Sequence, residues 1–157
     1  MSEMLGNQYF LARNYAAAAK QLKKALRHDA KNKSMRRKMI ICLNEIGEIR
    51  NAFRYFISLV KEDADFIIKT DPIGDDCPCP ELVFDAEREL NNNLSSVDFV
   101  LRLAMLWLYC DIQESFRYFL SAQQMSPADS DIKTILTVLK PKVLASQKTS
   151  NSAEAST

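Results

Sequence analysis

The sequence predicts an all-α fold, and three observations support this prediction. Only 3 glycines and 5 prolines interrupt the 157 residues, fewer than a series of strands and turns would usually need. Apolar residues recur at the three- and four-residue spacing of amphipathic helices. The chain also repeats itself, because the string FRYF occurs at 53–56 and again at 116–119. A chain of this length can bury a substantial core without a disulfide or a metal.

The internal repeat keeps one register over three segments. Shifting residues 5–30 by 34 positions, and then by a further 63, brings side chains of comparable size into equivalent positions. The aligned sets are Ala18, Ala52 and Ser115; Leu22, Phe56 and Phe119; Ala25, Leu59 and Ala122; and Ala30, Ala64 and Pro127. We expect the small residues to lie where two helices of a hairpin approach closely. The bulky residues should fill the space between hairpins.

These residues resemble the tetratricopeptide-repeat (TPR) family. The first segment adds Leu5, Gly6 and Tyr9 at the positions of the family's L-G-x-x-Y pattern. The resemblance covers about 2–65 and 96–128. It implies antiparallel helical hairpins stacked in a right-handed superhelix, and a non-enzymatic role as a protein-interaction adaptor or assembly scaffold.

The repeat places the helices along the chain. We expect helices at about 2–12, 15–28, 33–46, 49–62, 81–93, 96–110, 112–125 and 128–145, which form three hairpins at about 2–32, 33–65 and 96–128. Asn14, Glu48 and Asp111 share the position just before the second helix of each hairpin. A short acceptor side chain there can satisfy the free amides of the helix.

The third repeat segment lies 63 residues after the second, which exceeds the 34-residue period by 29 residues. This insert, at about 66–94, begins as a loop rich in Pro, Gly and Asp and becomes an acidic helix. It either carries function by projecting from the scaffold or serves as a local cap. The helix at 128–145 should cover the last hairpin and complete a single domain, 1–145. Residues 146–157 lack apolar anchors and are predicted to be disordered.

The charge is divided unevenly along the chain. Residues 1–60 hold 12 Lys and Arg against 4 Asp and Glu (+8), whereas residues 61–157 hold 9 against 16 (−7). This asymmetry favours head-to-tail association, so a self-assembling structural subunit, a homo-oligomer, is one alternative function. The most apolar run, 99–110, is too short to cross a bilayer, which predicts no membrane insertion. Scattered cysteines and no signal-peptide pattern favour a cytoplasmic location.

The sequence offers little for catalysis. It has no glycine-rich phosphate loop or nucleophile motif, and its one histidine, His28, lies near a helix end where a cation suits the helix dipole. We therefore expect no enzyme activity, no catalytic residue and no cofactor. Cys77 and Cys79 flank a single proline, whereas zinc sites space paired cysteines by two to four residues. A rigid loop is favoured over a metal or redox site.

A basic stretch at 23–38 holds eight Lys and Arg against only Asp29. It is interpreted as a solvated face or as a dock for an acidic peptide. Nucleic-acid binding is disfavoured because no aromatic platform is interleaved with the charges.

The resemblance also implies where a protein or peptide partner binds. In TPR arrays the first helix of each hairpin lines a concave groove. By motif position, the groove residues are Asn7, Phe10, Arg37, Lys38, Ile41 and Asn44. The alternative for each is a solvent-facing position without function. A second alternative for the whole chain is a TPR chaperone of the type III secretion kind, which the size and the three repeats resemble.

Overall fold

The structure is a computed structural model that describes the backbone of residues 1–155 and the side chains of residues 1–149. Throughout the described backbone the regular elements are helices, with no strand, which confirms the predicted all-α class. The chain divides into two compact units. The N-terminal unit comprises residues 1–67 and 71–77. The C-terminal unit comprises residues 68–70 and the chain from residue 78 onward.

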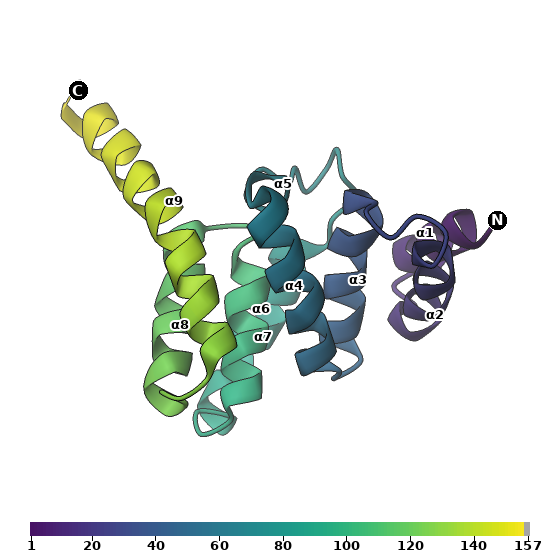
Figure 1. Cartoon of the computed structure of the whole chain (residues 1–157), viewed down its shortest axis with the longest axis horizontal. Helices are drawn as coiled ribbons and strands as arrows, with labels where there is room; N and C mark the ends of the chain where they lie inside the picture. Colours follow the sequence, from purple (N-terminus) through teal and green to yellow (C-terminus); the bar gives the residue numbers. More distant parts are fainter. Residues whose placement is uncertain (156–157) are drawn as a thin grey trace. The chain divides into compact units, whose positions relative to one another are not determined.

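The N-terminal unit is built from two helical hairpins. Helices α1 (Ser2–Leu11) and α2 (Tyr15–Leu26) form the first, and α3 (Lys33–Glu45) and α4 (Ile49–Asp63) form the second (Figure 1). Helix α2 packs against α3, and α1 also contacts α3, so the hairpins stack. The short helix α5 (Asp65–Ile68) follows α4, and a loop at 71–77 completes the unit.

Residue size explains how closely the first two helices approach. A Cβ atom added to Gly6 would lie 2.9 Å from the side chain of Leu22, so only glycine leaves room for this leucine against α1. Leu22, Ala18, Ala52 and Phe56 are all fully buried. Not every repeat position is covered, since the side chains of the predicted structural residues Leu5, Tyr9 and Ala25 retain some exposure.

The C-terminal unit contains the insert helix and the third hairpin. Helices α7 (Val97–Trp107) and α8 (Ile112–Met125) form that hairpin, α6 (Cys79–Arg88) packs on α7, and α9 (Ser130–Ala155) packs on α8 (Figure 1). A 3₁₀ turn, η1 (Leu90–Asn92), follows α6. Phe119 and Ala122 are fully buried, whereas Pro127 is exposed in the turn before α9. None of the described helices combines the length and the apolarity that a bilayer-spanning segment requires.

The small-residue position of the third hairpin carries a hydroxyl. Ser115 stands where the earlier hairpins have Ala18 and Ala52, and it is fully buried. Its Oγ donates a hydrogen bond of 2.6 Å to the carbonyl oxygen of Ala104 on α7. A buried hydroxyl without a partner would be destabilising, so this bond makes serine compatible with the site.

The expected caps are present at two of three positions. The Asn14 side chain accepts from the amide of Ala17 at 3.3 Å, and Asp111 Oδ1 accepts from the amide of Gln113 at 2.9 Å. Glu48 makes no such bond to the start of α4. The Glu side chain is one methylene longer than Asp, and short acceptors are strongly preferred at this position.

The end of the chain differs from the prediction. Helix α9 continues to Ala155, so residues 146–155 are helical where the sequence predicts a disordered tail; residues 156 and 157 lie outside the described part. The segment lacks apolar anchors but also lacks glycine and proline, so nothing in it terminates a helix that is already nucleated.

Candidate functional site

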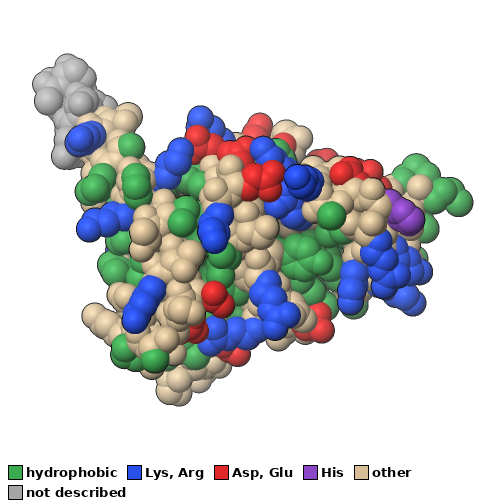
Figure 2. Space-filling model, viewed as in Figure 1, with side chains coloured by type: hydrophobic (Ala, Val, Ile, Leu, Met, Phe, Trp, Pro, Cys, Tyr) green, Lys and Arg blue, Asp and Glu red, His purple; other side chains and the backbone are tan. Residues whose placement is uncertain are grey.

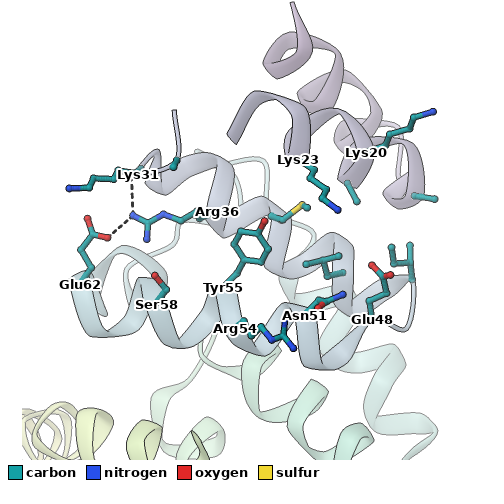
Figure 3. A pocket seen from close by; sticks show the side chains of 16 residues that line it. Lys20, Lys23, Lys31, Arg36, Glu48, Asn51, Arg54, Tyr55, Ser58 and Glu62 are labelled. Atoms are coloured by element: carbon teal, nitrogen blue, oxygen red, sulfur yellow. Dashed lines mark hydrogen bonds and ion pairs between the residues drawn. The ribbon is translucent and has the colours of Figure 1, made fainter. Parts of the chain in front are cut away.

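The N-terminal unit has a groove of about 860 Å³ between α2 and α4, with α3 beneath it (Figure 3). We call it the α2–α4 groove. All sixteen lining residues belong to the N-terminal unit. They are Ala16, Ala19, Lys20, Lys23, Ala30, Lys31, Arg36, Met39, Leu43, Ile46, Glu48, Asn51, Arg54, Tyr55, Ser58 and Glu62.

The floor of the α2–α4 groove is apolar because of the spacing along α3. Arg36, Met39 and Leu43 follow one another at three- and four-residue intervals and therefore share one face of the helix. Met39 and Leu43 are buried within the groove, whereas Ile46 is 40% exposed just beyond the end of α3. A partner side chain entering the groove would therefore meet an apolar surface.

The rim of the α2–α4 groove is mainly cationic. Five of its lining residues are Lys or Arg and two are Glu, which gives a charge of +3. Lys20 and Lys23 extend from α2, and Arg54 lies on the opposite wall formed by α4 (Figure 3). Lys20, Lys23 and Arg54 are exposed, so they can meet an anionic partner without unfolding the wall.

Lys and Arg side chains also gather on the surface around α2 (Figure 2). The exposed Lys24 and Arg27 contribute to this surface but do not line the groove.

One end of the groove is fixed by a buried guanidinium. Arg36 Nη2 donates to Glu62 Oε2 at 2.7 Å and to the carbonyl oxygen of Lys31 at 2.9 Å. The Arg36 side chain is only 5% exposed, and its Nε has no hydrogen-bond partner in the described structure. Beside it, Lys33 pairs with Asp63 at 3.0 Å. These contacts set the distance between α3 and α4 and leave one buried donor available.

The structure brings three predicted groove residues together on the face formed by α1 and α3. Lys38 Nζ donates to Asn7 Oδ1 at 2.9 Å and lies 5.8 Å from the centre of the Phe10 ring. Phe10 itself is buried and packs edge-on against Tyr15. Lys38 and Asn7 thus remain partly accessible, and Phe10 supports them from below.

The other predicted groove residues are covered. Arg37 is 9% exposed, and its guanidinium lies 4.4 Å from the Phe66 ring and donates to the Phe66 carbonyl oxygen at 3.1 Å. Ile41 and Asn44 are buried, and the Asn44 amide donates to the carbonyl oxygen of Ile40 at 3.0 Å. The spacing along α3 predicted that Arg37, Ile41 and Asn44 share one face of the helix. It could not show which other parts of the chain cover that face.

Burial and the neighbouring Arg37 charge lower the pKa of Lys38. The carboxylates of Asp76, Glu3 and Asp75 act in the opposite direction. The face formed by α1 and α3 therefore holds cations and carboxylates from three parts of the N-terminal unit.

The sequence contained part of the signal for the α2–α4 groove. Lys23, Lys31 and Arg36 belong to the basic stretch that was interpreted as a solvated face or a dock for an acidic peptide. The opposite wall, with Arg54 and Tyr55, was not predicted as a site. Those two residues belong to a string that the sequence presents only as a repeat.

The cysteines do not assemble with other ligating groups. Cys77 and Cys79 are disulfide-bonded, whereas Cys42 and Cys110 carry free thiols. Burial raises the pKa of Cys42 to about 12, so this thiol stays protonated and unreactive near neutral pH. Among the residues that the structure describes, no three His, Cys, Asp or Glu side chains lie together as a metal site would require.

No family model fits the sequence, and no curated protein is significantly similar to it.

Proposed function

We propose that this chain is a protein-interaction module of TPR-like architecture that binds an acidic segment of a partner protein in the α2–α4 groove. The observation that carries the proposal is the combination of an apolar floor with four exposed cations, Lys20, Lys23, Lys31 and Arg54, among the lining residues, whereas Arg36 is buried and paired with Glu62. A segment that alternates acidic and apolar side chains complements both features at once. In the same proposal the hairpins of the two units continue one repeat series, as their equivalent small and bulky positions suggest.

A protein segment fits the α2–α4 groove better than a nucleic acid does. Single-stranded nucleic acids are usually held by several aromatic side chains on which bases stack. Tyr55 is the one aromatic residue among those that line the groove. The buried Met39 and Leu43 would instead accept aliphatic side chains, which nucleic acids lack.

The test compares two charge-matched double variants. Lys20→Glu with Lys23→Glu reverses two rim charges, and Lys24→Glu with Arg27→Glu reverses two exposed charges of the same region outside the groove. The probe is a labelled peptide that alternates aspartate and leucine, followed by fluorescence anisotropy. Rim charge pairs are worth about 0.5–1 kcal/mol each, so the groove variant should bind roughly tenfold more weakly.

Three outcomes would overturn the proposal. The first is an absence of peptide binding at low salt. The second is an equal loss in both double variants, which would show that overall charge rather than the groove attracts the peptide. The third is tighter binding of a labelled poly-uridine RNA than of the peptide, with the same dependence on Lys20 and Lys23.

A further inference from the structure

A loop of the N-terminal unit reaches the face formed by α1 and α3. Asp75 Oδ1 is 3.4 Å from Arg37 Nη2. Arg37 is therefore held from two directions, by the Phe66 ring and carbonyl group and by this loop carboxylate. The residues predicted to receive a partner are thus met by an acidic segment of the chain itself.

The loop at 71–77 is held in a defined shape by its own residues. The amide of Asp71 donates to Asp75 Oδ2 at 2.8 Å, and Asp71 Oδ1 accepts from the amide of Ile73 at 3.1 Å. The amide of Cys77 donates to the carbonyl oxygen of Pro72 at 3.0 Å. A Cβ atom on Gly74 would lie 2.6 Å from Asp71 Oδ2, so a larger residue there would displace the Asp71 carboxylate that accepts from the amide of Ile73. The loop presents Asp75 to Arg37 as a preformed acidic ligand.

The tip of the loop is exposed, whereas its last residue, Cys77, is buried and disulfide-bonded. Pro72, Ile73 and Gly74 are exposed, and the Asp75 side chain keeps 35% of its surface in solvent. Partly exposed ion pairs contribute little to stability, and segments with few buried contacts open at low free-energy cost. An external acidic segment can therefore replace the loop without unfolding the hairpins.

We propose that the loop at 71–77 is a built-in acidic ligand of Arg37, and that an acidic protein segment competes with this loop for the face formed by α1 and α3. The loop would reduce the affinity for weak partners, because a tethered ligand acts at a high effective concentration. This surface is distinct from the α2–α4 groove and can exist whether or not that groove binds a partner.

The test uses the full chain carrying Lys20→Glu and Lys23→Glu, so that the α2–α4 groove does not contribute. The probe is a labelled poly-aspartate peptide. In this background, Asp75→Asn should tighten binding by about two- to fivefold, because the internal competitor is weakened. Gly74→Ala should also tighten binding of the peptide, because it disturbs the turn that presents Asp75, and it does so without changing any charge. Lys38→Ala should weaken binding of the peptide, both with Asp75 present and in combination with Asp75→Asn.

Hydrogen exchange provides the second measurement. Saturating poly-aspartate should accelerate exchange of the amides in 71–77. Asp85→Asn is the matched control, because Asp85 is an exposed carboxylate of the C-terminal unit; it should not alter peptide affinity. The proposal is overturned by unchanged exchange in the loop at saturation, or by Asp75→Asn and Gly74→Ala both leaving the affinity unchanged.

Discussion

The hydroxyl group of Tyr118 donates a hydrogen bond of 2.8 Å to Glu87 Oε1. The same oxygen accepts the indole N–H of Trp107 at 2.9 Å. Glu87 lies on α6, Trp107 on α7 and Tyr118 on α8, so one carboxylate joins the insert helix to both helices of the third hairpin. Within the C-terminal unit the insert therefore has a packing role, as the local-cap interpretation expected.

Replacing this carboxylate should destabilise the C-terminal unit. Glu87→Ala removes both interactions and leaves two partly buried donors unpaired, so we expect a loss of about 1–3 kcal/mol in the free energy of unfolding. Glu87→Gln keeps an acceptor oxygen and should cost less. Trp107 is the only tryptophan in the chain, so denaturant unfolding followed by its fluorescence reports on this site. Equal stability of the wild type and Glu87→Ala would contradict the assigned role.

The same contact should be visible in a titration. Burial, the hydrogen bond to Glu87 and the Glu87 charge raise the pKa of Tyr118 from 10.0 to about 12. Because the folded-state pKa is raised, the stabilisation is complete below pH 10 and is lost as the pH rises through 12. Ultraviolet absorbance of tyrosinate should include a late transition to which Tyr118 contributes. In Glu87→Gln this late transition should move to lower pH, and an unchanged curve would refute the coupling.

The contact between Gly6 and Leu22 predicts that a larger side chain at position 6 is harmful. Gly6→Val would force the Leu22 side chain away from α1, and overpacking of this kind costs about 1–3 kcal/mol. Amide exchange in α2 should accelerate accordingly. Leu22→Ala creates space, so the double variant should lose less than the sum of the two single losses. Additive losses would show that the two positions do not interact.

Helix positions could be predicted from the sequence because they depend on local information. The repeat register located the hairpins, and the boundaries predicted from it differ from those of the structure by only a few residues for the helices of the first two hairpins. The insert helix ends earlier than expected, at Arg88, and continues as the turn η1. The helix predicted at about 128–145 corresponds to α9, but its extension to Ala155 was not predicted, because the polar composition of that segment was interpreted as disorder.

The candidate sites could be predicted only in part, because they depend on which helices meet. The basic stretch at 23–38 was visible in the sequence, but the wall carrying Arg54 becomes its neighbour only through packing of α3 on α4. Similarly, motif position placed Arg37 and Lys38 on one face, yet Asp75 reaches Arg37 across 38 positions of sequence. Neither periodicity nor composition encodes that contact.

The three expected caps supply a final prediction, because equivalent positions in the repeat differ in their chemistry. Asp111 Oδ1 accepts from the amides of Gln113 and Glu114, at 2.9 and 3.5 Å, whereas Glu48 makes no cap bond. Asp111→Ala should therefore lower the free energy of unfolding by about 1 kcal/mol, and Glu48→Ala should change it by much less. Asp111→Asn retains a capping oxygen and serves as the control. Thermal unfolding followed by circular dichroism measures the stability of all three variants. A larger loss of unfolding free energy for Glu48→Ala than for Asp111→Ala would contradict this prediction, because it would mean that repeat position, rather than side-chain reach, determines the cap.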